Sequence, residues 1–368
     1  MTDVQAGVQE ALDELVAAGT ERGIAVAAYV DGQSVVDAVA GVADAATGRE
    51  VTPGTVFYNY SIGKGVMSTL VHQQVDAGLL GYDTRVAEVW PEFAAHGKEA
   101  VTVRHVLTHT AGVPGLPADV TVEDLTSWET MTRALEEAEP WWEPGTRVGY
   151  HAYTFGYLAG EVVHRVTGRP LAQVLRDDLA APIGYPDEIF FGMPGDQAHR
   201  LAVLEDAPSG SDWAADLPAD LPMFRAAPLT VFPTAALGND PRIVAADIPA
   251  GGKVSARAIA RMYAALVDDI DGTRLLGPQR LAQASALGST GTDEVFGNQS
   301  SWALGYALGL PWEGGEAARA IGMAGAGGSW AGVDLDRHLS LAVTKNMLTG
   351  DFAAVRRVVD CVVSAVDG

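Results

Sequence analysis

The chain has 368 residues, 48% of them hydrophobic, so it can bury a large core as one big domain or as two closely packed ones. Its 24 basic and 47 acidic residues give a formal charge of -23, which repels nucleic acid and anionic membrane surfaces. The single cysteine, Cys361, excludes an internal disulfide and lies in an apolar helical stripe, which favours a core thiol. The eight histidines show no metal-ligand spacing, so we expect neither a metal nor a cofactor.

The N-terminal segment predicts a helix of the mature fold. Hydrophobic residues recur at helical spacing from Val4 to Val16, and the first residues contain neither a basic segment nor the apolar run of a signal peptide. No apolar stretch approaches the roughly 18 residues that a membrane-spanning helix needs. We therefore expect a soluble, cytoplasmic protein without a membrane partner.

Short runs rich in Val and Ala predict strands near both chain ends. Residues 24–30 and 34–40 are separated by an Asp-Gly-Gln turn, which indicates two antiparallel strands. Residues 317–323 and 339–345 predict two further strands, and apolar residues at helical spacing over 352–366 predict a closing helix. These elements flank a mainly helical middle.

The predicted fold class is therefore α+β, with one antiparallel sheet formed from both chain ends, flanked by helices, and a mainly helical region inserted between them. We expect a single domain over 1–368, whose α/β part covers about 1–58 and 250–368 and whose helical part covers about 59–204. The segment of about 205–249 contains seven of the 19 prolines and little periodicity. Such a segment is typical of a lid or a site wall, and a surface excursion fits equally well.

A Ser-Ile-Gly-Lys stretch places Ser61 and Lys64 three residues apart at the start of a helix predicted over roughly 61–77. Residues at this spacing share a helix face, so the Lys64 ammonium can reach the Ser61 hydroxyl, and the helix N-terminus favours negative charge there. With only four lysines in the chain, about 0.15 such matches would arise by chance. Gly63 and Gly65 each cost about 1 kcal/mol of helix propensity, which indicates a close backbone approach. The alternative is a Ser cap followed by a surface Lys.

Two further segments contain residues able to complete such a site. In the segment 143–160, a Pro-Gly turn leads to Tyr150, which is predicted to open another helix. A lysine ammonium nearby would lower the pKa of Tyr150 and make it a base, although an isolated Tyr is more often a packed aromatic. The glycine-rich segment 322–330 can expose backbone N–H groups to an oxyanion. By itself it is equally typical of a bulge or a hairpin turn.

In this order and spacing the three segments resemble the serine β-lactamase-like superfamily, which includes class C β-lactamases, family VIII-type carboxylesterases, D-aminopeptidases and statin-type acyltransferases. Further stretches similar to this superfamily lie at 103–114, 249–257 and 304–309, and only 205–247 looks unfamiliar. The resemblance thus covers most of the chain. It implies a β-lactamase/transpeptidase-like fold.

The resemblance also implies residue roles. Ser61 would be the nucleophile, Lys64 would orient and deprotonate it, and Tyr150 would be general base and then general acid. The oxyanion would lie between the backbone N–H groups of Ser61 and Ala326, and losing one such donor usually costs about 10² to 10³ in rate. His105 and His109 lie in a stretch that forms a structural turn in the family, so we do not expect them to be catalytic.

The sequence departs from the family pattern at two positions that bear on the substrate. Ala152 replaces the Asn whose amide contacts acylamino substrates, and Met323 replaces the Lys or His that opens the third motif. Recognition of carboxylate-bearing β-lactams is thereby weakened, and an uncharged ester or thioester fits better. Flanking tryptophans such as Trp141 and Trp142 either line an acyl pocket or only pack against neighbouring side chains. We expect substrate contacts at His151 (or hydrogen-bond support from it), Met323, Ala324, Gly325 and Trp330.

The leading hypothesis is a cytoplasmic serine esterase that forms a covalent acyl-Ser61 intermediate with a small ester, thioester or amide. The alternative is an acyltransferase that passes the acyl group to an alcohol or amine, for example in secondary metabolism. β-Lactamase or D-aminopeptidase activity, and a non-catalytic binding homologue, rank lower.

Overall fold

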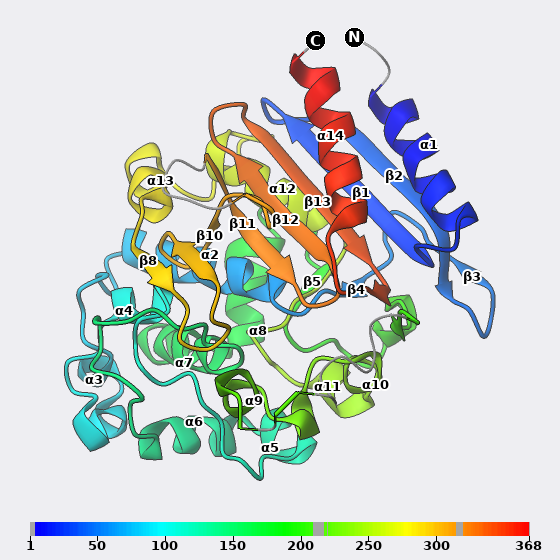
Figure 1. Cartoon of the computed structure of the whole chain (residues 1–368). Helices are drawn as coiled ribbons and strands as arrows, with labels where there is room; N and C mark the ends of the chain where they lie inside the picture. Colours follow the sequence, from blue (N-terminus) through cyan, green and yellow to red (C-terminus); the bar gives the residue numbers. More distant parts are fainter. Residues whose placement is uncertain (1–3, 209–216, 219, 314–318, 368) are drawn as a thin grey trace.

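The computed structural model describes residues 4–208, 217–218, 220–313 and 319–367. In this part of the chain a nine-stranded antiparallel sheet has the order β3-β2-β1-β13-β12-β11-β10-β9-β8, so strands from both chain ends lie side by side (Figure 1). The predicted sheet is thereby confirmed. Its strands are β1 (Gly23–Val30), β2 (Gln33–Asp44), β3 (Arg49–Glu50), β8 (Ser289–Thr292), β9 (Gln299–Trp302), β10 (Ala307–Leu308), β11 (Ala320–Gly325), β12 (Ser329–Asp334) and β13 (Leu339–Lys345).

The central strands β1, β11, β12 and β13 are buried on both faces, and their successive side chains point alternately to the two faces. In β1, Ile24 and Val26 pack on the terminal helices α1 (Val4–Ala17) and α14 (Ala353–Asp367), which lie side by side on one face (Figure 1). Ala25 and Ala27 face the main core on the other side, where α12 (Ala256–Val267) covers the sheet. The predicted terminal helices and the β1–β2 hairpin are thus present.

Helix α2 (Ile62–Asp76) runs through the main core and packs on β11 and on α7 (Thr154–Thr167). Of its residues only Gln73 and Asp76 are not buried, which explains why it is apolar almost all round rather than amphipathic. The close backbone approach predicted from its glycines is confirmed. A Cβ on Gly63 would lie 2.4 Å from the Gly252 nitrogen, and one on Gly65 would lie 2.1 Å from the Tyr263 hydroxyl.

The remaining helices are short and mostly belong to the inserted region. They are α3 (Val86–Val89), η1 (Pro91–Gly97), α4 (Val103–Leu107), α5 (Val122–Thr126), α6 (Trp128–Glu137), α8 (Leu171–Val174), η2 (Leu175–Ala180), η3 (Ala198–Arg200), α9 (Pro222–Ala226), η4 (Leu229–Val231), α10 (Ala235–Gly238), α11 (Pro241–Ala245) and α13 (Pro278–Ser285). Two small sheets join β4 (Phe57–Tyr58), β7 (Lys253–Val254) and β5 (Ile189–Phe190), and β14 (Met347–Leu348) with β6 (Glu205–Asp206). The proline-rich segment thus consists of short elements; its residues 209–216 and 219 lie outside the described chain. No helix in the described ranges is long and apolar enough to cross a membrane.

Three local predictions differ from the structure. Strand β12 was not predicted, because its Ser, Trp and Gly content conceals the alternation. The strand predicted from residue 317 begins at Ala320 in the described chain, and residues 317 and 318 lie outside it. Tyr150 does not open a helix, since α7 begins at Thr154. The N–H groups of Tyr150 and His151 donate instead to side chains of distant segments, which holds this stretch as a loop.

The packing of α2 predicts that Gly63→Ala lowers the free energy of unfolding by about 1–3 kcal/mol, the usual cost of overpacking. Helix propensity alone would favour Ala by about 1 kcal/mol. The sign of the change in the free energy of unfolding therefore separates overpacking from helix propensity. The clash is with backbone atoms of Gly251 and Gly252, which cannot rotate away. Urea unfolding measures the change, and Gly195→Ala, where nothing lies within 4 Å of the new Cβ, is the control. Equal stability of the two variants would contradict this account.

Candidate active site

Ser61 stands at the N-terminal end of α2 and is partly exposed. The preceding residue, Tyr60, has a φ of +45°, a left-handed conformation that costs a non-glycine residue about 1–3 kcal/mol. Hydrogen bonds to the 249–252 segment hold it there: the Gly252 N–H donates to the Tyr60 carbonyl at 2.8 Å, and the Asn59 N–H donates to the Gly252 carbonyl at 2.8 Å. The backbone is therefore bent so that the Ser61 side chain reaches the surface.

Lys64 is completely buried one turn below Ser61. Its Nζ lies 3.0 Å from Ser61 Oγ and 3.4 Å from the Ala250 carbonyl oxygen. Burial disfavours the charged form and lowers the pKa of Lys64 to about 7. A substantial fraction of Lys64 is therefore neutral at neutral pH and able to accept the Ser61 proton.

Tyr150 completes the cluster from the loop before α7. Its ring centroid lies 4.8 Å from Lys64 Nζ. Burial raises the pKa of Tyr150, the nearby Asp293 carboxylate raises it further, and contact with the Ser61 hydroxyl only partly offsets these effects. The predicted lowering of this pKa by Lys64 was therefore wrong: desolvation outweighs a cation that sits over the ring face. Tyr150 therefore keeps its proton at neutral pH, whereas the Lys64 amine beside Ser61 titrates near 7.

The end of β11 lies against the start of α2. A Cβ on Gly325 would come within 2.2 Å of the Asn59 carbonyl oxygen, so only glycine lets the strand approach this closely. The turn that follows carries Ala326, which is exposed, and is closed by the Gly328 N–H donating to the Gly325 carbonyl at 3.1 Å. Within the described chain neither the Ser61 N–H nor the Ala326 N–H has a protein acceptor. Both are free for an oxyanion.

The other side chains of the glycine-rich segment 322–330 point to different faces of the sheet. Met323 is buried and packs with Tyr150 and Trp302, so it places an uncharged thioether behind the site. Ala324 and Trp330 face the opposite side, where the Trp330 indole packs in the core beneath α14. We expected a substrate contact at Trp330, and its place on the far face of the sheet overturns that expectation. The Ala324 side chain likewise points away from Ser61.

His151 is fully buried, and both of its ring nitrogens contact backbone groups. Its Nδ1 donates to the Gly149 carbonyl at 2.7 Å, and its Nε2 accepts the Val113 N–H at 3.2 Å. This geometry favours hydrogen-bond support over substrate contact. His109 Nδ1 accepts the His151 N–H at 3.1 Å, and its ring lies 4.8 Å from that of Tyr150. Burial lowers the pKa of both imidazoles, that of His151 to about 4, so both are neutral supports of the Tyr150 loop.

Residues of the β8–β9 loop were missed by the sequence analysis. Asp293 Oδ2 accepts the Tyr150 N–H, and Oδ1 accepts the N–H groups of Val295 and Phe296, each at 2.9 Å. The Trp302 ring stacks on that of Tyr150 with centroids 5.5 Å apart at 20°. A buried acid in a polar loop 143 residues from its partner leaves no local pattern in the sequence. Only the Asp, Gly and Asn residues of the loop, which are typical of turns, hinted at a structured segment.

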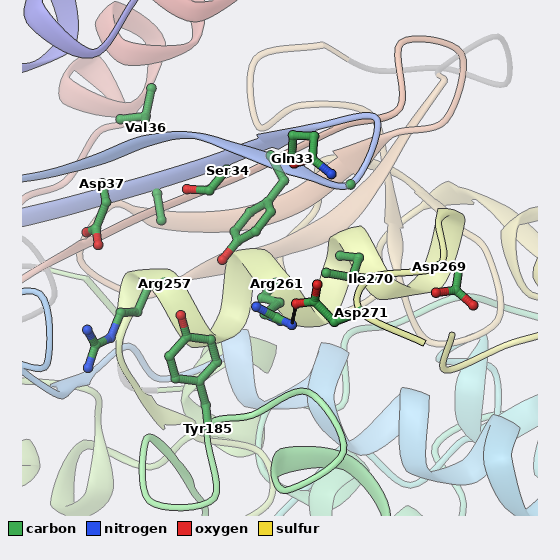
Figure 2. A pocket seen from close by; sticks show the side chains of 13 residues that line it. Gln33, Ser34, Val36, Asp37, Tyr185, Arg257, Arg261, Asp269, Ile270 and Asp271 are labelled. Carbon is green, nitrogen blue, oxygen red and sulfur yellow. Dashed lines mark hydrogen bonds and ion pairs between the residues drawn. The ribbon is translucent and has the colours of Figure 1, made fainter. Parts of the chain in front are cut away.

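A pocket of about 330 Å³ lies between the β1–β2 hairpin and α12, away from the Ser61 cluster. Figure 2 shows Arg257, Arg261 and Tyr185 below it and Ser34 and Asp37 above. Arg257 is paired with Glu188 and Arg261 with Asp271, so these cations already have partners. None of the expected site residues lines this pocket. No group of three possible metal ligands occurs in the described part of the chain.

Comparison with known proteins agrees with the geometry at Ser61. A model of the beta-lactamase family matches residues 8–363, and the chain therefore belongs to that family. It is an enzyme whose relatives include hydrolases with esterase activity in their names. The predicted superfamily and fold are thus confirmed.

Individual relatives show how wide the family is. The esterase/beta-lactamase LipL of Mycobacterium tuberculosis is 36% identical over 270 residues, which cover 69% of this chain and 61% of that protein. The chain thus spans about three-fifths of this relative's length. A solved family VIII carboxylesterase is 31% identical with a TM-score of 0.88, covering 98% of this chain and 97% of that one. A penicillin-binding protein homologue from Caulobacter crescentus is 32% identical with a TM-score of 0.84, covering 99% and 98%.

The pKa of Lys64 predicts the pH dependence of Ser61 reactivity. Labelling of Ser61 by a neutral fluorophosphonate should accelerate as pH rises through about 7, because Lys64 loses its proton and becomes the base. Lys64→Met should lower the rate by about 10² to 10⁴ and remove this midpoint. Lys253→Met is a matched control, because burial also lowers the pKa of Lys253 to about 7 but its Nζ donates to the Phe191 carbonyl. A midpoint near 10 in the wild type would assign the titration to another group.

The Asp293 contacts predict that Asp293→Asn disturbs Tyr150 without touching Ser61. One amide oxygen can keep two of the N–H bonds, but the amide NH₂ then faces the Tyr150 N–H, a donor against a donor. An unpaired buried donor costs about 1–3 kcal/mol, so both stability and the rate of Ser61 labelling should fall. Thermal unfolding and labelling kinetics measure the two effects. Unchanged labelling would remove Asp293 from the positioning of Tyr150.

Proposed function

We propose that the chain is a serine esterase that forms a covalent acyl-Ser61 intermediate with a small, uncharged ester or thioester. The observation that carries the proposal is the 3.0 Å contact between Ser61 Oγ and a fully buried Lys64 whose pKa lies near 7. A base with a pKa near the working pH is the most effective proton acceptor for a hydroxyl nucleophile. The esterase names among the relatives support the same reaction class.

In the proposed reaction, Ser61 Oγ attacks the carbonyl carbon while its proton passes to neutral Lys64. The carbonyl oxygen becomes an oxyanion that accepts hydrogen bonds from the Ser61 and Ala326 N–H groups. The leaving oxygen then takes a proton from Tyr150, and Tyr150 is reprotonated from the Lys64 ammonium. Water repeats the cycle on the acyl enzyme and releases the acid. Lys64 and Tyr150 thus return to their starting protonation states, and atoms and protons balance.

The surroundings of Ser61 favour a neutral substrate. Met323 is buried at the position where a cation would bind a carboxylate, and Ala152 offers no side-chain amide. The formal charge of -23 adds a long-range field that repels anions. We therefore rank an ester or thioester above a carboxylate-bearing β-lactam as substrate.

Acyl transfer to an alcohol or amine is the second candidate. It is favoured by the aromatic and thioether groups beside Tyr150, namely Trp302, Phe296 and Met323, because an apolar surface binds an organic acceptor in competition with water. The same three catalytic groups serve both reactions. The two functions differ only in what attacks the acyl enzyme.

Intact-protein mass spectrometry tests the proposed function. Wild-type protein mixed with short p-nitrophenyl esters and acyl thioesters should gain one acyl group and turn the ester over, whereas Ser61→Ala should do neither. Thr69→Ser is a control that removes a buried methyl group from the same helix and keeps the hydroxyl, whose partners are the Gly65 carbonyl and Tyr306 and not Lys64. If the adduct decays faster with added alcohol or amine and yields the acylated acceptor, transferase activity is supported. Turnover by Ser61→Ala at the wild-type rate would end the proposal.

A further inference from the structure

The β8–β9 loop carries an exposed phenylalanine against the proposed general acid. Phe296 is 47% exposed, and its ring centroid lies 5.7 Å from that of Tyr150 at an interplanar angle of 52°. Tyr150 also stacks on Trp302, which is buried. Tyr150, Phe296 and Trp302 thus form one aromatic wall. Among the strongly exposed large apolar side chains of the described chain, Phe296 is the aromatic one.

Phe296 is held in place by the same carboxylate that holds Tyr150. Asp293 accepts the N–H groups of both residues at 2.9 Å. The loop is closed further by the Gly297 N–H, which donates to the Asp293 carbonyl at 2.7 Å, and by the Glu294 N–H, which donates to the Val148 carbonyl at 2.9 Å. These hydrogen bonds fix the backbone that carries the exposed Phe296 ring beside Tyr150, so the ring offers apolar surface to a ligand bound at Ser61.

The chemistry of the site decides which part of a substrate meets this wall. In the proposed reaction Tyr150 gives its proton to the leaving oxygen, so the alcohol part of an ester must lie against Tyr150. The acyl oxygen lies toward the N–H groups of Ser61 and Ala326 instead. Because Phe296 packs against the Tyr150 ring, an alcohol part that lies against Tyr150 also comes within reach of the Phe296 ring.

We infer that the aromatic wall is the binding site for the alcohol part of the ester, and that it selects alcohols with an aromatic or similarly flat apolar group. The inference rests on the proposed function. Acyl transfer to an alcohol is the reverse of ester cleavage, so the same wall also selects the acyl acceptor.

The test compares benzyl acetate with ethyl acetate, which form the same acetyl enzyme and have leaving alcohols of similar acidity. In the wild type kcat/KM should favour the benzyl ester. Phe296→Ala should reduce this preference about 2- to 10-fold, the range of a lost aromatic contact, and Phe296→Tyr should restore it. Both esters form the same acetyl-Ser61, so any effect of a substitution on its decay, followed by mass spectrometry, is common to both esters and does not change the ratio of their kcat/KM values. Leu79→Ala, a 49% exposed residue beyond the far end of α2, should change nothing.

A second ester pair separates the alcohol side from the acyl side. The ratio between ethyl phenylacetate and ethyl acetate should be the same for wild type and Phe296→Ala. If this ratio falls and the benzyl preference stays, the wall binds the acyl group and the inference is overturned; an unchanged benzyl preference in Phe296→Ala overturns it as well. Failure of the proposed function looks different, because the wild type then forms no acetyl-Ser61 and hydrolyses neither ester.

Discussion

The site depends on a lysine amine that is held out of water next to a serine hydroxyl. An exposed lysine has a pKa near 10.4 and would be charged at neutral pH. Burial lowers the pKa of Lys64 to about 7, because α2 is enclosed by the sheet, by α7 and by the 249–252 segment. The two glycines beside it cost helix propensity, but without them the neighbouring segments could not close over the lysine. Burial and reactivity therefore have the same structural cause.

The remaining parts of the site are arranged around that buried amine by segments far apart in the chain. The strained Tyr60 backbone is held by Gly252, and the end of β11 reaches Asn59 only because Gly325 lacks a side chain. The two N–H groups that face a developing oxyanion thus come from opposite ends of the sequence. They are brought together because β11 lies in a sheet built from both chain ends. The sheet therefore brings the two proposed oxyanion donors together and also forms part of the core.

The loop that carries Tyr150 is held in place by residues that take no part in the proposed reaction. Its loop is held by the Asp293 carboxylate on one side and by the neutral rings of His109 and His151 on the other. None of these groups contacts Ser61 in the structure, yet together they hold a loop that would otherwise join the following helix. The phenol remains protonated, which suits a proton donor to the leaving group. Burial acts on both groups in the same sense, because it favours the neutral amine of Lys64 and the neutral phenol of Tyr150.

Local patterns in the sequence determined the helix that carries Ser61 and Lys64, the terminal helices, the hairpin and the antiparallel sheet, because each rests on periodicity or turn chemistry between residues near in the chain. The spacing of the motifs determined the family. Only the tertiary structure decided that Trp330 faces away from Ser61, that Asp293 and Phe296 join the site, and that Tyr150 keeps its proton. Strand register and desolvation decide these features, and both arise from contacts between segments distant in sequence, which no local pattern records.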